Sequence, residues 1–152
     1  MALFTGTFEN KIDRKGRVSL PADFRTELPN NDDRVVYVYR SPNWSALEAC
    51  DKAFMQRLAN SLDQLDMFSD EEDDLSATLV ADARRIALDS EGRIILPSLF
   101  MKFLNLTNSA TFVGRGSRFQ IWAPTEFVDY SKLARERARG RTVRLSQLDN
   151  GD

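Results

Sequence analysis

The sequence contains no histidine and only one cysteine, Cys50. Histidine is the commonest metal ligand and a frequent general base in proteins, so its absence argues against most acid–base enzymes. A single cysteine without histidine excludes thiol–imidazole catalysis, the usual zinc sites and an intrachain disulfide. We therefore expect a protein that works in a reducing compartment, is not an enzyme, and needs no metal or other cofactor.

A long apolar run and an excess of positive charge are also missing. No window approaches the ~20 apolar residues of a membrane span. The N-terminal stretch MALFTGTFENKIDRKGR lacks the apolar segment of a signal peptide. These absences predict a soluble cytoplasmic protein without a membrane partner or a small-molecule substrate. The formal net charge is −2, so binding to nucleic acid would need a local basic patch.

The sequence of 152 residues contains two copies of one motif, here called the duplicated phrase. KIDRKGRVSLPADFR spans residues 11–25, and ALDSEGRIILPSLF spans residues 87–100. When the chain is aligned with itself at an offset of 76, seven of the seventeen positions from 12 to 28 are identical, which indicates an internal duplication. The identical pairs are Asp13 and Asp89, Gly16 and Gly92, Arg17 and Arg93, Leu20 and Leu96, Pro21 and Pro97, Phe24 and Phe100, and Leu28 and Leu104.

Each copy predicts the same local structure. Alternating apolar residues predict a strand, the sequence DRKG supplies a turn in which Gly16 adopts a positive φ, and a second strand completes a hairpin. Leu20, Phe24 and Leu28 recur every four residues, which predicts a short helix with one apolar face. A second hairpin follows, from DDRVVYVYR and WSALEAC in the first half and from ATFVGRG and RFQIWA in the second. Each half is therefore expected to be a hairpin, a helix and a hairpin.

Three further helices are expected outside the repeats, as packing elements of the core or between subunits. The first, at residues 51–65, has apolar residues at Phe54, Leu58, Leu62 and Leu65. The acidic run at residues 70–74 opens the second, with inward-facing Leu75, Leu79 and Val80. The third begins at Pro124, with apolar contacts expected from Phe127, Tyr130 and Leu133.

The duplication divides the chain into four expected parts. These are a first repeat at residues 7–51, a helical connector at residues 52–82, a second repeat at residues 83–126, and a C-terminal helix with a basic tail at residues 127–152. We expect the arginine-rich end of the chain to fray into a mobile tail that is either solvated or touches phosphates.

The repeated aspartates first raise the question of acid–base chemistry, because aspartic proteases use two carboxylates that share a proton. Those sites need a glycine two residues after the aspartate, whereas here the glycine comes three residues after it. An arginine four residues on would also hold each aspartate ionised. We instead expect the pairs Asp13–Arg17 and Asp89–Arg93 to close a turn, and the same aspartate can orient its arginine toward DNA.

The two copies differ in charge. Residues 11–25 carry five basic and two acidic side chains, whereas the loop of the second copy has one basic residue against two acidic ones, with Arg84 and Arg85 just upstream. The first loop is therefore the better candidate to meet a polyanion. Its predicted DNA-binding residues are Lys11, Asp13, Arg14, Lys15, Arg17 and Arg25, with Asp13 orienting the loop and the basic residues meeting phosphates and guanine.

These two phrases, 76 residues apart, resemble the MraZ family, which is related to the AbrB/SpoVT regulators. The resemblance implies an α+β fold in which two repeats of one chain interlace as a pseudo-symmetric swapped-hairpin β-barrel with flanking helices. It also implies rings of many subunits, double-stranded DNA as the partner, and a location on the nucleoid. Family members regulate transcription by binding short direct repeats in the promoter ahead of the division and cell-wall gene cluster.

The sequence departs from the family pattern in two places. The stretch FTGTFEN stands where Arg-Gly-Glu is common, and Met101 stands where an arginine is common. Asp89 and Arg93 match the signature of the second repeat. Two alternatives to a sequence-specific regulator remain open: an AbrB-like antitoxin that binds its own operator and a toxin, and an assembly protein that does not bind DNA.

Overall fold

The computed structural model describes residues 2–29 and 34–145 and has an α+β fold. Its strands are β1 (Thr7–Lys11), β2 (Arg17–Ser19), β3 (Val35–Arg40), β4 (Ala46–Cys50), β5 (Arg84–Ala87), β6 (Arg93–Ile95), β7 (Ser109–Gly114) and β8 (Phe119–Trp122). Its helices are α1 (Ala22–Arg25), α2 (Lys52–Leu62), α3 (Asp70–Leu75), the π-helical η1 (Ser76–Val80), α4 (Ser98–Leu104) and α5 (Pro124–Ala138). None of the helices in the described ranges is both long and apolar enough to cross a membrane.

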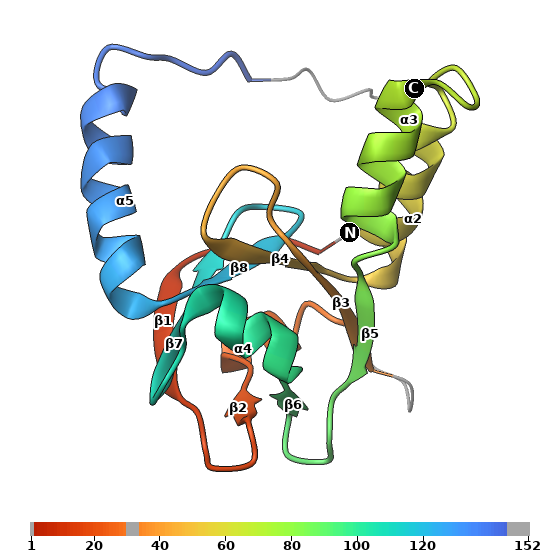
Figure 1. Cartoon of the computed structure of the whole chain (residues 1–152). Helices are drawn as coiled ribbons and strands as arrows, with labels where there is room; N and C mark the ends of the chain where they lie inside the picture. The colour runs from red at the N-terminus through yellow and green to blue at the C-terminus, as the bar shows by residue number, and fades with distance from the viewer. Residues whose placement is uncertain (1, 30–33, 146–152) are drawn as a thin grey trace.

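The two halves of the chain exchange strands with each other. β1 of the first half pairs with β7 of the second, and β5 of the second half pairs with β3 of the first. β4 pairs with β8, and β2 pairs with β6 so that Val18 lies opposite Ile94, its own equivalent in the duplication. The pairings therefore obey a pseudo-twofold axis that passes between these two residues. The α+β class and the interlaced hairpins are confirmed (Figure 1).

The strands do not close into a barrel, and in this detail the expectation is wrong. Six strands form one antiparallel sheet in the order β1-β7-β8-β4-β3-β5, while β2 and β6 form a two-stranded sheet of their own. β1 and β2 form no ladder with each other: an isolated bridge joins Ile12 to Val18, and Nδ2 of Asn10 donates to the carbonyl of Ser19 at 2.6 Å. Pro21 and Pro97 lie two residues beyond the ends of β2 and β6 and have no backbone N–H, so these ladders stop after three residues.

The apolar positions of the repeated phrase form the core that both halves share. Leu20, Phe24 and Phe100 are fully buried, and Leu28 and Leu104 are nearly so. The ring of Phe24 packs 5.3 Å from that of Phe4 and 4.9 Å from that of Phe119, measured between centroids. Neither half could bury these rings alone, because the aromatic cluster draws on both.

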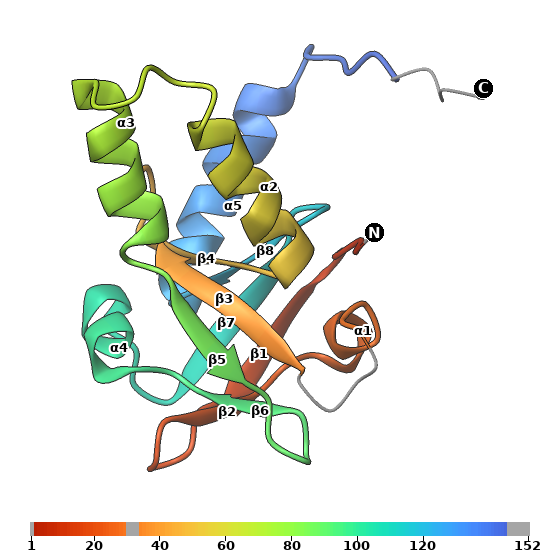
Figure 2. The ribbon, with the colours of Figure 1, turned by 90° about the vertical axis from the view of Figure 1, so that its right-hand side faces the viewer.

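The longer helices lie on the side of the molecule away from the hairpin turns (Figures 1 and 2). Asp51 caps the N-terminus of α2, where its Oδ1 accepts a hydrogen bond of 2.8 Å from the backbone N–H of Phe54. α5 packs on the sheet through Phe127 and Tyr130, as expected. Val80 is 39% exposed, so the expectation that it faces inward is wrong. Leu133 is 53% exposed and takes no part in the packing of α5 on the sheet. The part of the basic tail from residue 146 on lies outside the described residues.

Candidate nucleic-acid interface

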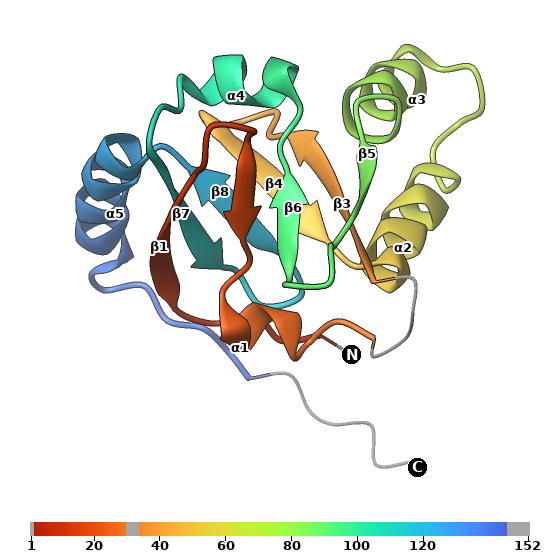
Figure 3. The same ribbon diagram turned by 90° about the horizontal axis from the view of Figure 1, so that it is seen from below.

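The two hairpin turns of the duplicated phrase lie at the same end of the molecule, at opposite ends of the antiparallel β2–β6 pair (Figures 1 and 3). The first loop connects β1 to β2 and consists of residues 12–16, and the second loop connects β5 to β6 and consists of residues 88–92. The backbone N–H of Leu20 donates to the carbonyl of Gly92 at 3.0 Å, and the N–H of Leu96 donates to the carbonyl of Gly16 at 3.1 Å. These reciprocal hydrogen bonds fix the two loops relative to each other.

One aspartate closes each loop. Oδ1 of Asp13 accepts hydrogen bonds of 2.9 Å from the backbone N–H groups of Lys15 and Arg17, and its Oδ2 accepts one of 2.6 Å from Nε of Arg17. Asp89 repeats this pattern with Glu91 and Arg93, at 2.9, 2.9 and 2.8 Å. The predicted turn-closing pairs are therefore confirmed.

The same hydrogen bonds act on the acidity of both carboxyl groups. The backbone N–H of Arg17 is the main cause that holds the pKa of Asp13 below its usual value. The backbone N–H of Arg93 does the same for the pKa of Asp89. Both aspartates are therefore ionised at neutral pH, when they hold the two arginines in place.

The two arginines nevertheless differ in what surrounds them. Nη2 of Arg93 forms an additional ion pair of 2.6 Å with Oε2 of Glu91, and its hydrogen bond to Asp89 is the main cause that raises the pKa of Arg93. In the first loop Lys15 takes the place of Glu91. Arg17 is paired only through Nε among the described residues, so its terminal nitrogens are without a carboxylate partner.

Most of the predicted DNA-binding residues lie together on the first loop. Arg14 and Lys15 are exposed at its tip, and Arg17 follows at the start of β2, where its side chain is 31% exposed. Lys11 is exposed at the end of β1, opposite Ser109 of β7. These four basic side chains make the first loop and the strand ends beside it a basic edge of the molecule, with Asp13 among them.

Arg25 lies against the second loop, away from the other predicted residues. Its Nη1 donates to the carbonyl of Leu20 at 2.6 Å, and its side chain covers Gly92 so closely that a Cβ there would lie 2.3 Å from Cδ of Arg25. The exchange of hairpins causes this placement, because it brings α1 of the first half against the turn of the second.

Sequence reasoning missed Arg34, which also lies at the second loop. Its Nη2 donates to the carbonyl of Arg25. The two arginines line a cavity of about 450 Å³ together with Ser90 and Glu91. The second loop, acidic in sequence, is therefore flanked by two guanidinium groups from the other half. Only the pairing order of the strands could have indicated this neighbourhood.

Thiol and carboxylate groups are the side chains left for redox or metal chemistry, because the sequence has no histidine. Cys50 is buried on β4, and burial raises the pKa of its thiol to about 12, so the thiol is protonated at neutral pH. Within residues 2–29 and 34–145, no group of three acidic or cysteine side chains is arranged to hold a metal ion.

Comparisons with known proteins agree with the duplicated geometry. The family model described as "MraZ protein, putative antitoxin-like" matches residues 3–65 and 79–146. The chain belongs to the MraZ family. Proteins named "Transcriptional regulator MraZ" are similar to it over most of their length. The one from Gluconacetobacter diazotrophicus is 43% identical over 145 residues, which cover 93% of this chain and 88% of the relative.

Two further MraZ relatives show the same breadth of similarity. The protein of that name from Pelagibacter ubique is 40% identical over 136 residues, which cover 90% of this chain and 88% of the relative. The protein from Rickettsia bellii is 34% identical over 146 residues, which cover 95% of this chain and 97% of the relative.

Proposed function

We propose that this MraZ-family chain is a transcriptional regulator that binds double-stranded DNA through its two hairpin turns, with the first loop as the reader. The observation that carries the proposal is the state of Arg17. Its Nε is fixed on Asp13 at 2.6 Å, while its terminal nitrogens have no carboxylate partner among the described residues. A guanidinium held in this way is pre-oriented for the O6 and N7 acceptors of guanine.

The neighbours of Arg17 supply the contacts that do not depend on base sequence. Arg14 and Lys15 are exposed at the loop tip, where they can pair with phosphates on either side of a groove. Lys11 extends the basic edge along β1. Because the second loop carries Asp89 and Glu91, Arg25 and Arg34 contribute there by offsetting this negative charge near the DNA backbone.

Assembly of several chains completes the proposal. One loop with three or four cations binds weakly, and an oligomer, such as the ring expected for the family, multiplies such contacts along DNA. Short direct repeats in the promoter of the division and cell-wall gene cluster suit this arrangement, because each repeat meets one copy of the same loop. The protein would then be associated with the nucleoid.

The direct test is a gel-shift titration of the full-length protein. The probe is the DNA upstream of its own gene, and the matched control is a shuffled duplex of the same length and composition. We expect tighter binding to the natural sequence at every salt concentration, and a steep loss of binding to both duplexes as salt rises. Equal affinity for the two duplexes would contradict sequence-specific recognition. No binding to either would favour the assembly protein that does not bind DNA.

A further inference from the structure

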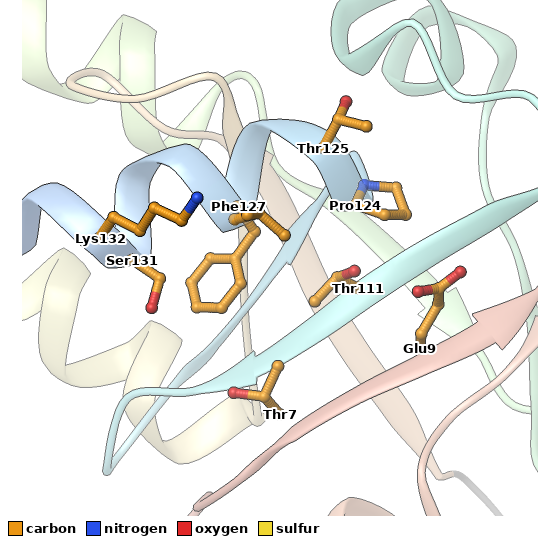
Figure 4. A pocket seen from close by; sticks show the side chains of 9 residues that line it. Thr7, Glu9, Thr111, Pro124, Thr125, Phe127, Ser131 and Lys132 are labelled. Atoms are coloured by element: carbon orange, nitrogen blue, oxygen red, sulfur yellow. The ribbon is translucent and has the colours of Figure 1, made fainter.

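A groove of about 540 Å³ runs between α5 and the outer side of strands β1 and β7 (Figure 4). Phe127 and Val128 of α5 line it together with Thr7 of β1 and Thr111 of β7, with Glu9 at one end and Lys132 at the other. Val128 is 52% exposed. The groove is therefore an apolar concavity with a carboxylate at one end and an ammonium group at the other.

The duplication shows what fills the equivalent place in the other half. There Tyr37, Met55 and Ala83 hold the positions of Thr111, Phe127 and Thr7, and Leu79 of η1 packs against them in one apolar cluster. The α3–η1 segment thus covers this surface of the first half. In the second half, no described segment takes the place of η1.

The reason lies in the residues before β1. They precede β1 as η1 precedes β5, its equivalent strand, but they run extended along β7, where Phe4 and Gly116 exchange backbone hydrogen bonds of 2.7 and 3.0 Å. A segment committed to this pairing cannot fold back as a helix over α5. The groove is therefore left open by the same strand pairing that buries Phe4.

The connection between α2 and α3 carries a matching protrusion. Met67 and Phe68 are 67% and 85% exposed there. Phe68 also has a φ of 68°, a left-handed conformation that is uncommon for a bulky residue. An aromatic side chain held outward at a strained turn is well suited to insert into an apolar groove.

The charges on either side of the two features are complementary. α3 begins two residues after Phe68 and places five carboxylates in a row, at residues 70–74. The second half of α5 and the described residues after it carry exposed Lys132, Arg135, Arg137 and Arg139, and Glu136 is the one acidic residue between 132 and 145; the acidic Glu126 and Asp129 lie in the first half of α5. Ion pairs involving any of these groups are absent from the described part of the chain. α5 and α3 lie on opposite sides of the molecule, so one copy cannot bring them together (Figures 1 and 3).

We propose that Met67 and Phe68 of one copy insert into the α5 groove of a second copy, with α3 of the first facing Lys132 and the arginines of the second. The contact joins different surfaces of the two chains, so it repeats head to tail and forms a ring where the rotation between copies closes. The proposal rests on the assembly in the proposed function and is independent of DNA recognition.

Two variants test the contact from its two sides. Phe68→Asn removes the aromatic ring at a position whose left-handed backbone asparagine tolerates, so the melting temperature should not fall. Val128→Asp places a charge in the groove. Leu133→Asp is the matched control, because Leu133 is equally exposed on α5, at 53%, and does not line the groove. Light scattering should give a larger assembly for the wild type and the control, and a single chain of 17.3 kDa for each variant.

Mixing the two variants distinguishes this contact from a symmetric one. The intact protrusion of the Val128→Asp chain can enter the intact groove of the Phe68→Asn chain, so the mixture should contain dimers and nothing larger. A wild-type mass in both variants, or no dimer in the mixture, would overturn the proposal and assign the groove to another partner. A monomeric wild type would overturn the proposed assembly as well, while the gel-shift titration decides DNA binding separately.

Discussion

At Asp13 and Asp89 a single carboxylate group accepts three hydrogen bonds and so fixes the turn around it. Their spacing to Arg17 and Arg93 was enough to predict these pairs, because four residues across a tight turn bring two side chains together. The position of Arg25 could not be predicted in this way. It depends on which half supplies the neighbouring turn, and local sequence does not carry that information.

The two aspartates predict a loss of stability in acid. Their pKa values lie below the usual 3.8 in the folded protein. The stability that they contribute is therefore full above the unfolded pKa and is lost as the pH falls through the lower folded pKa. Thermal melting of the wild type and of the double variant Asp13→Asn, Asp89→Asn checks this. The wild type should melt higher at about pH 7, and the gap should shrink toward about pH 3; a gap that stays constant would contradict the assignment.

The two turn glycines should respond differently to the same substitution. Gly16 and Gly92 have φ values of 81° and 76°, so alanine at either position costs about 1–2 kcal/mol in backbone strain. At Gly92 the new Cβ would also lie 2.3 Å from Cδ of Arg25, whereas the nearest heavy atom at Gly16 is 3.5 Å away. Gly92→Ala should therefore lower the melting temperature more than Gly16→Ala.

A third variant identifies the cause of that difference. In Arg25→Ala, Gly92→Ala the crowding is gone, so the additional destabilisation should disappear in a double-mutant cycle. If the two glycine variants lowered the melting temperature equally, the side chain of Arg25 would be free to move aside and would not pack firmly on the second loop.

Among the structural elements, the hairpins and short helices follow from local patterns, whereas the order of the strands does not. Alternation and the Leu-Pro phrase predict where strands and helices begin. β1 pairs with β7 and β5 pairs with β3, so each of these strands has its partner in the other half of the chain. The equivalent strands of the two halves have similar sequences, so local patterns do not distinguish these partners. The core that both halves share does. The exposure of Leu133 could not be predicted either, because the spacing of apolar residues on a helix does not show how much of the helix the sheet covers.

The exchange of strands predicts that neither half folds by itself. Residues 1–66 lack β7, β6 and β8, the partners of β1, β2 and β4, and would leave the ring of Phe24 without that of Phe119. Expressed alone, this fragment should be unfolded or aggregated, or should dimerise so that a second copy replaces the missing half. Circular dichroism would show whether the fragment is folded, and light scattering would give its mass. A stable folded monomer would contradict the exchange of strands between the halves.

On the scale of the whole molecule, a net charge of −2 conceals three separate charged regions. The basic edge of the first loop lies at one end, and acidic α3 and the basic end of α5 lie on opposite sides. The net charge of the chain therefore says little about DNA binding here. In the proposed assembly the basic loop is repeated, and a neighbouring copy neutralises α3. Raising the salt concentration should weaken both DNA binding and the contact between copies, because each depends on exposed charges.

Comparing Arg17→Ala with Arg93→Ala tests whether the phrase is repeated for folding while only its first copy reads DNA. DNA affinity is measured at several salt concentrations, with thermal melting alongside. Arg17→Ala should stay folded and lose roughly 1–3 kcal/mol of binding per site if Arg17 contacts a base edge. Arg93→Ala releases Asp89 and Glu91 together, so it should lose less binding and at least as much stability. Equal losses of binding in two equally destabilised variants would contradict the account.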